Sequence, residues 1–144
     1  MGKQMQNKDG ITLGQRGTGI TTLINFSGKG LNDIQVRKVR DHFGIRIERK
    51  FRNGQFNIEA STEGVNPCEE YDVVDVVNKV GLTNEDWLMK DLLIILPSNG
   101  MLALAIMAEI HYRCGQWRDI LVLDGNNVNV MCLHTLSAYD SNRK

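Results

Sequence analysis

Apolar residues follow two different spacings along the chain. In segments 92–96 and 120–123 they form short continuous runs, which are typical of strands covered on both faces of a sheet. Segment 21–26 is rich in β-branched residues, which also predicts a strand. Elsewhere apolar residues recur every three or four residues, the spacing of one buried helix face, most clearly in Val73, Val76, Val77 and Val80. The alternation of these two patterns predicts strands separated by helices.

The helix after the first strand begins at Leu31 and ends at Gly44, a C-cap residue. Its predicted buried stripe consists of Val36, Val39 and Phe43. Residues 45–51 then alternate in polarity, which indicates a strand near an edge of the sheet, and Arg52-Asn53-Gly54 is a turn signal. Segment 55–60 forms either a short extra strand or a crossing of the sheet edge.

Turn and cap signals divide the second half of the chain. Pro67 opens the valine-rich helix, acidic residues follow in its first turn, and Gly81 ends it. Segment 83–86 has the residues of a helix N-cap and predicts one more helical turn that holds Trp87.

The most apolar segment is 92–107, which Pro97-Ser98-Asn99-Gly100 divides into a strand and a helix. The helix Met101–Cys114 is nearly all apolar in its first two turns, so we expect the domain or a second subunit to bury it on all sides. Asp124–Asn127 is a turn, and Val128–Leu133 pairs back as an antiparallel hairpin strand.

The element order β-α-β-α-β-α-β-β predicts an α/β fold, a three-layer Rossmann-like sandwich whose mainly parallel sheet carries an antiparallel C-terminal hairpin strand. We expect a flexible leader over residues 1–20, a single domain over 21–136 and a polar tail over 137–144. The glycine-rich segment 14–19 looks like a phosphate loop, but no predicted strand precedes it.

Charge, cysteine content and the length of apolar runs limit which binding partners and cell compartments we expect. Seventeen basic and seventeen acidic residues cancel, which argues against a protein that coats long nucleic acids. The three cysteines form no CxxC pair, and this odd number fits a reducing cytoplasm. No apolar run has the roughly 20 residues of a membrane span, and residues 1–19 lack the apolar core of a signal peptide. A cytoplasmic protein without membrane contact is the expectation.

Two strand–turn–helix segments carry the candidate chemistry. One turn, Ser27-Gly28-Lys29-Gly30, follows a strand that contains Asn25, and the other is Pro97-Ser98-Asn99-Gly100. In a parallel sheet both turns lie at the C-terminal edge, where helix N-termini favour anions and glycine allows close approach of a ligand. The sequence therefore predicts a site for a phosphate-containing ligand, with Arg49, Lys50 and Arg52 as further cations. Ordinary turn and cap roles for the same residues stay open.

Other reactive side chains are predicted to lie elsewhere. His42 and His111 stand near the C-terminal ends of helices and His134 follows the hairpin, so all three belong at the opposite edge of the sheet and have structural roles. No set of metal ligands is recognised, and no cofactor is implied. The aromatic residues are expected to serve in packing: Trp87, Tyr112 and Trp117.

Two signatures resemble a known family. Leu23–Ser27, with Gln35 and Val39, is similar to the N-terminal signature of the small CRISPR-associated Csx proteins, in particular the family numbered fifteen in that series. A second signature is matched by Leu96–Ser98, Ala105–Glu109, His111, Arg113, Gly115 and Ile120–Leu123. The likeness covers about residues 21–133 and omits the leader.

This resemblance implies a Rossmann-like protein of type III CRISPR antiviral defence, whose relatives bind cyclic tetra-adenylate and in some cases open it as ring nucleases. It carries a ligand-binding role to Asn25, Ser27 and Ser98, and assigns none to Lys29. The leading hypothesis is a homodimeric or larger assembly that lowers free cyclic oligoadenylate, by sequestration or by slow metal-independent ring opening with catalytic residues unassigned. The alternatives are an assembly module that uses helix 101–114, and a nucleotide-binding enzyme on a flavodoxin-like scaffold.

Overall fold

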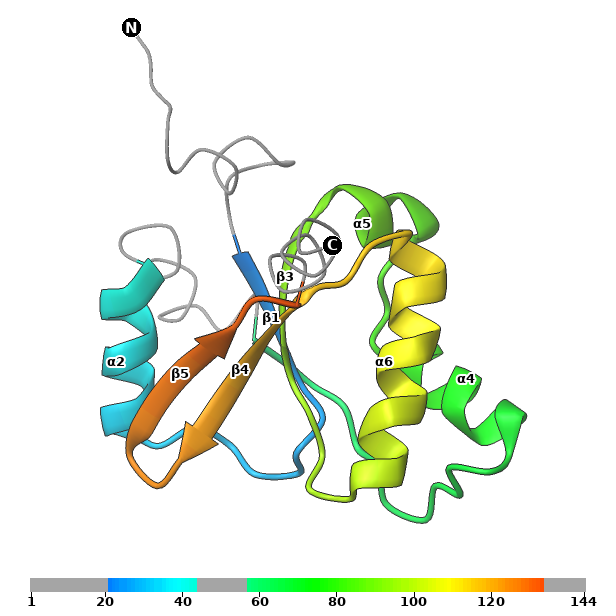
Figure 1. Ribbon diagram of the computed structural model, residues 1–144, viewed down its shortest axis with the longest axis horizontal. Helices are drawn as coiled ribbons and strands as arrows, with labels where there is room; N and C mark the ends of the chain where they lie inside the picture. The colour runs from blue at the N-terminus through cyan, green and yellow to red at the C-terminus, as the bar shows by residue number, and fades with distance from the viewer. Residues whose placement is uncertain (1–20, 44–56, 134–144) are drawn as a thin grey trace, which may run out of the picture.

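A five-stranded sheet forms the centre of the protein (Figure 1). The computed structural model describes residues 21–43 and 57–133. The sheet has the order β2-β1-β3-β4-β5, and four strands run parallel while β5 runs antiparallel to β4. The strands are β1 (Thr21–Asn25), β2 (Asn57–Glu59), β3 (Asp91–Ile95), β4 (Asp119–Asp124) and β5 (Asn127–Met131). The α/β fold expected from the sequence, with its antiparallel C-terminal hairpin, is confirmed.

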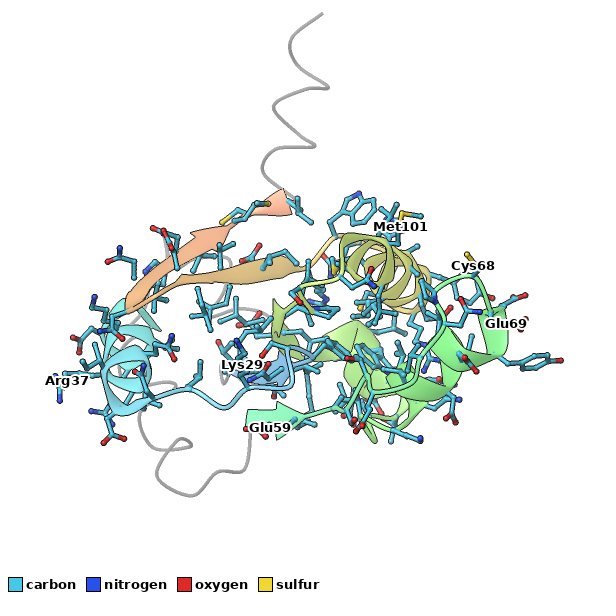
Figure 2. All side chains as sticks on the ribbon, turned by 90° about the horizontal axis from the view of Figure 1, so that it is seen from below. Lys29, Arg37, Glu59, Cys68, Glu69 and Met101 are labelled. Carbon is cyan, nitrogen blue, oxygen red and sulfur yellow. The ribbon has the colours of Figure 1, made fainter. Side chains whose placement is uncertain are left out.

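Helices cover both faces of this sheet unequally (Figures 1 and 2). Helix α2 (Asp33–Phe43) packs on one face through Val39, which joins a small cluster with Leu23, Leu93, Ile95 and Leu121. The larger cluster lies on the opposite face, under α4 (Glu70–Asn78), α5 (Asn84–Met89) and α6 (Gly100–Cys114). Adjacent strand residues such as Leu23 and Ile24 enter opposite clusters, as the two-residue period of a strand requires.

The strand order creates a topological switch point. From β1 the chain continues to β2 on one side, whereas from β3 it continues to β4 on the other side. In open α/β sheets of this order, ligands bind outside the carboxyl ends of the strands where the winding direction reverses. Here that position lies between the ends of β1 and β3.

Several predicted helix features are confirmed, but two predicted helix starts are wrong. Helix α2 begins at Asp33 rather than at Leu31, because Asn32 caps it. Val73, Val76 and Val77 of α4 are buried, as is Val80 just beyond its end, and Gly81 follows with a positive φ. The helix begins at Glu70, however, and Pro67 lies in the turn before it. Asn66 makes that turn, because its side chain accepts from the Cys68 N–H and its own N–H donates to Asp72.

The expectation that α6 is buried on all sides is wrong for this chain by itself, because Met101, Leu104 and Tyr112 are exposed. Tyr112 is 82% exposed and is not a packing residue, whereas Trp117 is 37% exposed and packs against the His111 ring, and Trp87 is fully buried. No helix in ranges 21–43 and 57–133 is long and apolar enough to cross a bilayer.

The edge strand beside β1 comes from the segment that the sequence left undecided. Residues Asn57–Glu59 pair in parallel with Leu23–Asn25, so the short-strand interpretation of 55–60 is correct. The strand predicted at 45–51, the turn at 52–54 and the cap at Gly44 lie outside the described residues.

Helix α5 begins with a reciprocal capping box. The Thr83 hydroxyl accepts from the Asp86 N–H at 3.0 Å, and the Asp86 carboxylate accepts from the Thr83 N–H at 3.0 Å. The backbone hydrogen bond from Thr83 is the main reason why the pKa of Asp86 lies below its ordinary value. The ionised carboxylate is therefore the form that stabilises the fold.

This capping box predicts a pH-dependent effect of Asp86→Asn. Since the folded pKa is lowered, the stabilisation is present above the pKa of an unfolded aspartate, about 3.9, and is lost as the pH falls through the folded value. Urea unfolding should show the variant less stable than wild type at pH 7, with the difference vanishing at about pH 2. Glu85→Gln, which removes a neighbouring carboxylate outside the box, is the control. A difference between Asp86→Asn and wild type that does not vary with pH contradicts this role.

Candidate functional site

The two predicted turns lie side by side at the carboxyl edge of the sheet. Strands β1 and β3 pair from Thr21–Asp91 to Asn25–Ile95, and the Phe26 N–H extends this pairing by donating to the Ile95 carbonyl at 2.9 Å. The turns 27–30 and 97–100 follow immediately. Figure 2 looks onto this edge of the sheet. The predicted position of both turns at the carboxyl edge of β1 and β3 is therefore confirmed for the backbone.

Asn25 builds the first turn from the inside. Its side chain, only 1% exposed, donates to the Lys29 carbonyl at 2.8 Å and accepts from the Ser27 N–H at 2.9 Å and the Ser27 hydroxyl at 2.7 Å. The Ser27 hydroxyl in turn accepts from the Lys29 N–H at 3.1 Å. Gly28 completes the turn with a φ of +81°, a conformation that favours glycine.

Two of the candidate binding residues therefore have partners within the loop. Because the polar atoms of Asn25 and Ser27 bond to the loop itself, these side chains fix its shape and leave its outer surface to other groups. Lys29 is exposed on that surface, and no carboxylate of the described residues forms an ion pair with it.

Asparagines, rather than the two serines, cap the helices that follow the turns. Asn32 accepts from the Gln35 N–H at 2.8 Å while the Gln35 side chain accepts from the Asn32 N–H at 2.9 Å, a reciprocal cap on α2. Asn99 accepts from the Leu102 N–H and caps α6. Ser98 is exposed, and its hydroxyl has no hydrogen-bond partner among the described residues. Pro97 is buried beneath it, and Gly100 is the first residue of α6.

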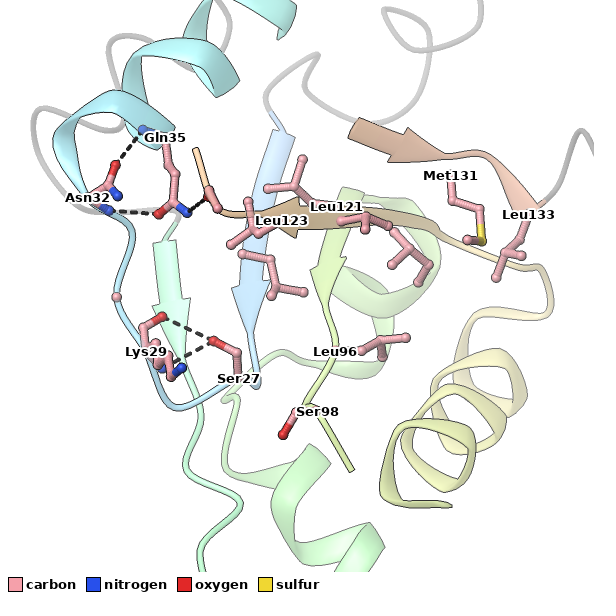
Figure 3. A pocket seen from close by; sticks show the side chains of 15 residues that line it. Ser27, Lys29, Asn32, Gln35, Leu96, Ser98, Leu121, Leu123, Met131 and Leu133 are labelled. Atoms are coloured by element: carbon pink, nitrogen blue, oxygen red, sulfur yellow. Dashed lines mark hydrogen bonds between the residues drawn. The ribbon is translucent and has the colours of Figure 1, made fainter. Parts of the chain in front are cut away.

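A cavity of about 720 Å³ opens beside the first turn (Figure 3). It exists because β4 pairs with β3 only at Asp119 and Ile120, after which the β4–β5 hairpin diverges from the sheet. Its volume lies within the ~300–1,000 Å³ of typical small-molecule sites. The divergence therefore leaves room for a ligand between the end of β3 and the hairpin.

Polar contacts from α2 hold the tip of this hairpin. Gln35 donates to the Gly125 carbonyl at 2.7 Å, Asn32 donates to the Asn126 side chain at 3.1 Å, and Lys38 donates to the Asn126 carbonyl at 2.8 Å. The same two residues that cap α2 thus also fix the hairpin, and this arrangement sets the width of the cavity.

The cavity is apolar along one side and polar at one end. Leu96, Leu121, Leu123, Met131 and Leu133 contribute apolar side chains, and Ser27, Lys29, Asn32, Gln35 and Ser98 contribute polar ones (Figure 3). Gly30 also lines it. Lys29 supplies the single charge among these lining residues. Such a surface suits a ligand with a flat apolar part and an anionic part.

A second, smaller cavity lies on the other side of the same loop. Its volume is about 280 Å³, and it is lined by Asn25, Gly28, Lys29, Glu59, Ala60 and Ser61. Lys29 lines both cavities. Glu59 is not among the residues predicted from the sequence, because the pattern of segment 55–60 left its strand undecided. Choosing the short strand at 55–60 would have placed Glu59 at this edge.

The remaining candidates lie apart from the two cavities or outside the described residues. His42 and His111 stand in the last turns of α2 and α6, as expected, and the ring of His111 lies 4.1 Å from that of Trp117. Arg49, Lys50, Arg52 and His134 are not described. In the described part of the chain, no three His, Cys, Asp or Glu side chains are grouped to hold a metal ion.

Comparison with protein-family models, with curated proteins and with solved structures finds no match to this chain. The site therefore rests on its own geometry.

The hydrogen bonds of Asn25 predict a stability loss in Asn25→Ala. This variant removes one donor and one acceptor that close the 27–30 turn, and we expect a loss of about 2 kcal/mol in the free energy of unfolding. Urea denaturation measures it. Asn129→Ala, at an exposed position in β5, should change stability by less than about 0.5 kcal/mol. Equal losses in the two variants would contradict the loop-building role.

Proposed function

We propose that this protein binds cyclic tetra-adenylate, the messenger of type III CRISPR defence, at the carboxyl edge of β1 and β3 and thereby lowers its free concentration. The observation that carries the proposal is the pair of neighbouring turns at the switch point, with a cavity beside them that offers an apolar wall and a cationic end. The resemblance of the two signatures to the Csx proteins supports this choice of ligand.

The phosphate and the base of such a ligand are each matched by a different group of residues at the site. In this proposal a phosphate accepts hydrogen bonds from the Lys29 ammonium and the Ser98 hydroxyl, and it lies at the N-terminus of α6, the positive end of the helix dipole. A purine base packs on the leucine and methionine side of the larger cavity. Since the messenger repeats the same unit four times, a two-fold dimer of the protein presents equivalent sites to it.

Sequestration is favoured over ring opening. Fast cleavage without a metal needs a general base of near-neutral pKa beside the ribose hydroxyl, most often a histidine. The described histidines, His42 and His111, stand in the last turns of their helices, while both cavities adjoin the 27–30 turn. Tight binding with slow or no turnover is therefore the proposed behaviour.

An assembly module is the second candidate, and the exposed side of α6 favours it. Met101, Leu104 and Tyr112 expose large apolar side chains on one helix, which is the composition of a protein-contact surface. Under this alternative the protein oligomerises whether or not nucleotide is present.

Calorimetric titration with cyclic tetra-adenylate tests the proposed site through Lys29→Ala. Loss of the one cation among the described residues that line the larger cavity should weaken binding about tenfold. Lys79→Ala removes an equal charge from the C-cap of α4, where Lys79 pairs with Asp75, and should leave affinity unchanged. Chromatography of the ligand over hours distinguishes sequestration, with the ring intact, from ring opening. No binding by wild type contradicts the proposal.

The apolar wall is tested by Met131→Glu. A carboxylate there replaces the surface on which the base packs and repels the phosphates, so we expect at least about tenfold weaker binding. Leu104→Glu introduces the same charge on α6, at a position that lines neither cavity, and should bind as wild type does. If Met131→Glu and Leu104→Glu lose affinity for the ligand equally, the purine base does not occupy the larger cavity. Reduced oligomerisation of Leu104→Glu alone would favour the assembly module.

A further inference from the structure

The smaller cavity places a carboxylate beside the loop that is proposed to bind phosphate. Glu59 is the last residue of β2 and stands in register with Asn25, the last residue of β1. Its carboxylate oxygen Oε2 lies 3.4 Å from the position that a Cβ would take on Gly30. Glu59 therefore reaches along the side of the 27–30 turn. Figure 2 shows Glu59 and Lys29 at this edge of the sheet.

The carboxylate of Glu59 is available for a ligand. The residue is exposed, and no ion pair or hydrogen bond of its side chain is found among residues 21–43 and 57–133. Among the described residues that line this cavity of about 280 Å³, Lys29 is the one other charged residue, and Ser61 is a further polar one. This is a small polar compartment that can accept hydrogen bonds, in contrast to the apolar wall on the other side of the loop.

An ionised carboxylate only accepts hydrogen bonds, so its ligand must supply a donor. In a nucleotide that donor is a ribose hydroxyl or the amino group of the base. In dinucleotide-binding Rossmann folds, an acidic side chain that follows the phosphate-binding turn in the chain accepts from a ribose hydroxyl while that turn binds phosphate. Glu59 and the 27–30 turn have the same relative placement.

We infer that Glu59 accepts a hydrogen bond from the ribose 2′-hydroxyl of the bound nucleotide, and so makes the site selective for ribonucleotides over deoxyribonucleotides. This inference rests on the proposed function, because it assigns the sugar of the same ligand to the smaller cavity. The 2′-hydroxyl is the group by which a protein distinguishes the two sugars.

The test compares the dissociation constants of cyclic tetra-adenylate and its fully 2′-deoxy counterpart. Wild type should prefer the ribose ring by about tenfold or more, the strength of a hydrogen bond to a charged acceptor. Glu59→Ala should reduce this preference to about twofold or less, and should bind the deoxy ring as well as wild type or better, because a negative charge near the phosphates is removed. Glu59→Gln keeps an uncharged acceptor and should retain an intermediate preference.

Glu63→Ala is the matched control, since it removes the same charge from the exposed loop after β2 and lines neither cavity. Its preference for ribose should equal that of wild type. A preference for the ribose ring that survives in Glu59→Ala overturns the inference. Wild type that binds both rings equally well also overturns it, but leaves the proposed function intact. If wild type binds neither ring, the proposed function and this inference fail together. If Glu59 accepts instead from the base amino group, Glu59→Ala weakens both rings by the same factor.

Discussion

The parallel pairing of β1 with β3 is the constraint on which the candidate site depends. These strands are distant in sequence, and each is almost completely buried, so their register is fixed by two hydrophobic clusters at once. The bond from the Phe26 N–H to the Ile95 carbonyl extends that register just past the strands. The paired ends of β1 and β3 therefore fix the positions of the two turns, of the helix caps that follow them and of both cavities.

The unequal covering of the sheet explains why there is a cavity to fill. Three helices cover one face, whereas the described residues place only α2 on the other. There the hairpin leaves β3 after two paired residues and is held at its tip by amide and ammonium groups of α2. Polar contacts at the tip add to the apolar packing of Leu121, Leu123, Val128 and Val130 in keeping the hairpin in place. The divergence of the hairpin from β3 leaves the gap that forms the larger cavity.

Much of the fold could be predicted from the sequence, because burial on both faces gives strands a continuous apolar run and burial on one side gives helices their spacing. The roles within the site could not. Asn25 and Ser27 were identified as important, but whether their polar atoms face a ligand or the loop depends on bond directions that no spacing reveals. Glu59 was missed because a three-residue strand carries too little pattern to fix its register. Whether the domain or a second subunit covers α6 was left open, because apolar composition alone does not say which side of a helix is covered.

Lys29 has a consequence that follows from lining both cavities. One ammonium has three N–H donors and a single positive charge, so anionic groups bound on the two sides of the loop are attracted to the same charge. Their contributions to affinity are then thermodynamically coupled rather than additive, and a fragment that fills one compartment alters the affinity of the other for a second fragment. A ligand long enough to pass over the loop meets one continuous site, although the backbone of residues 27–30 divides it in two.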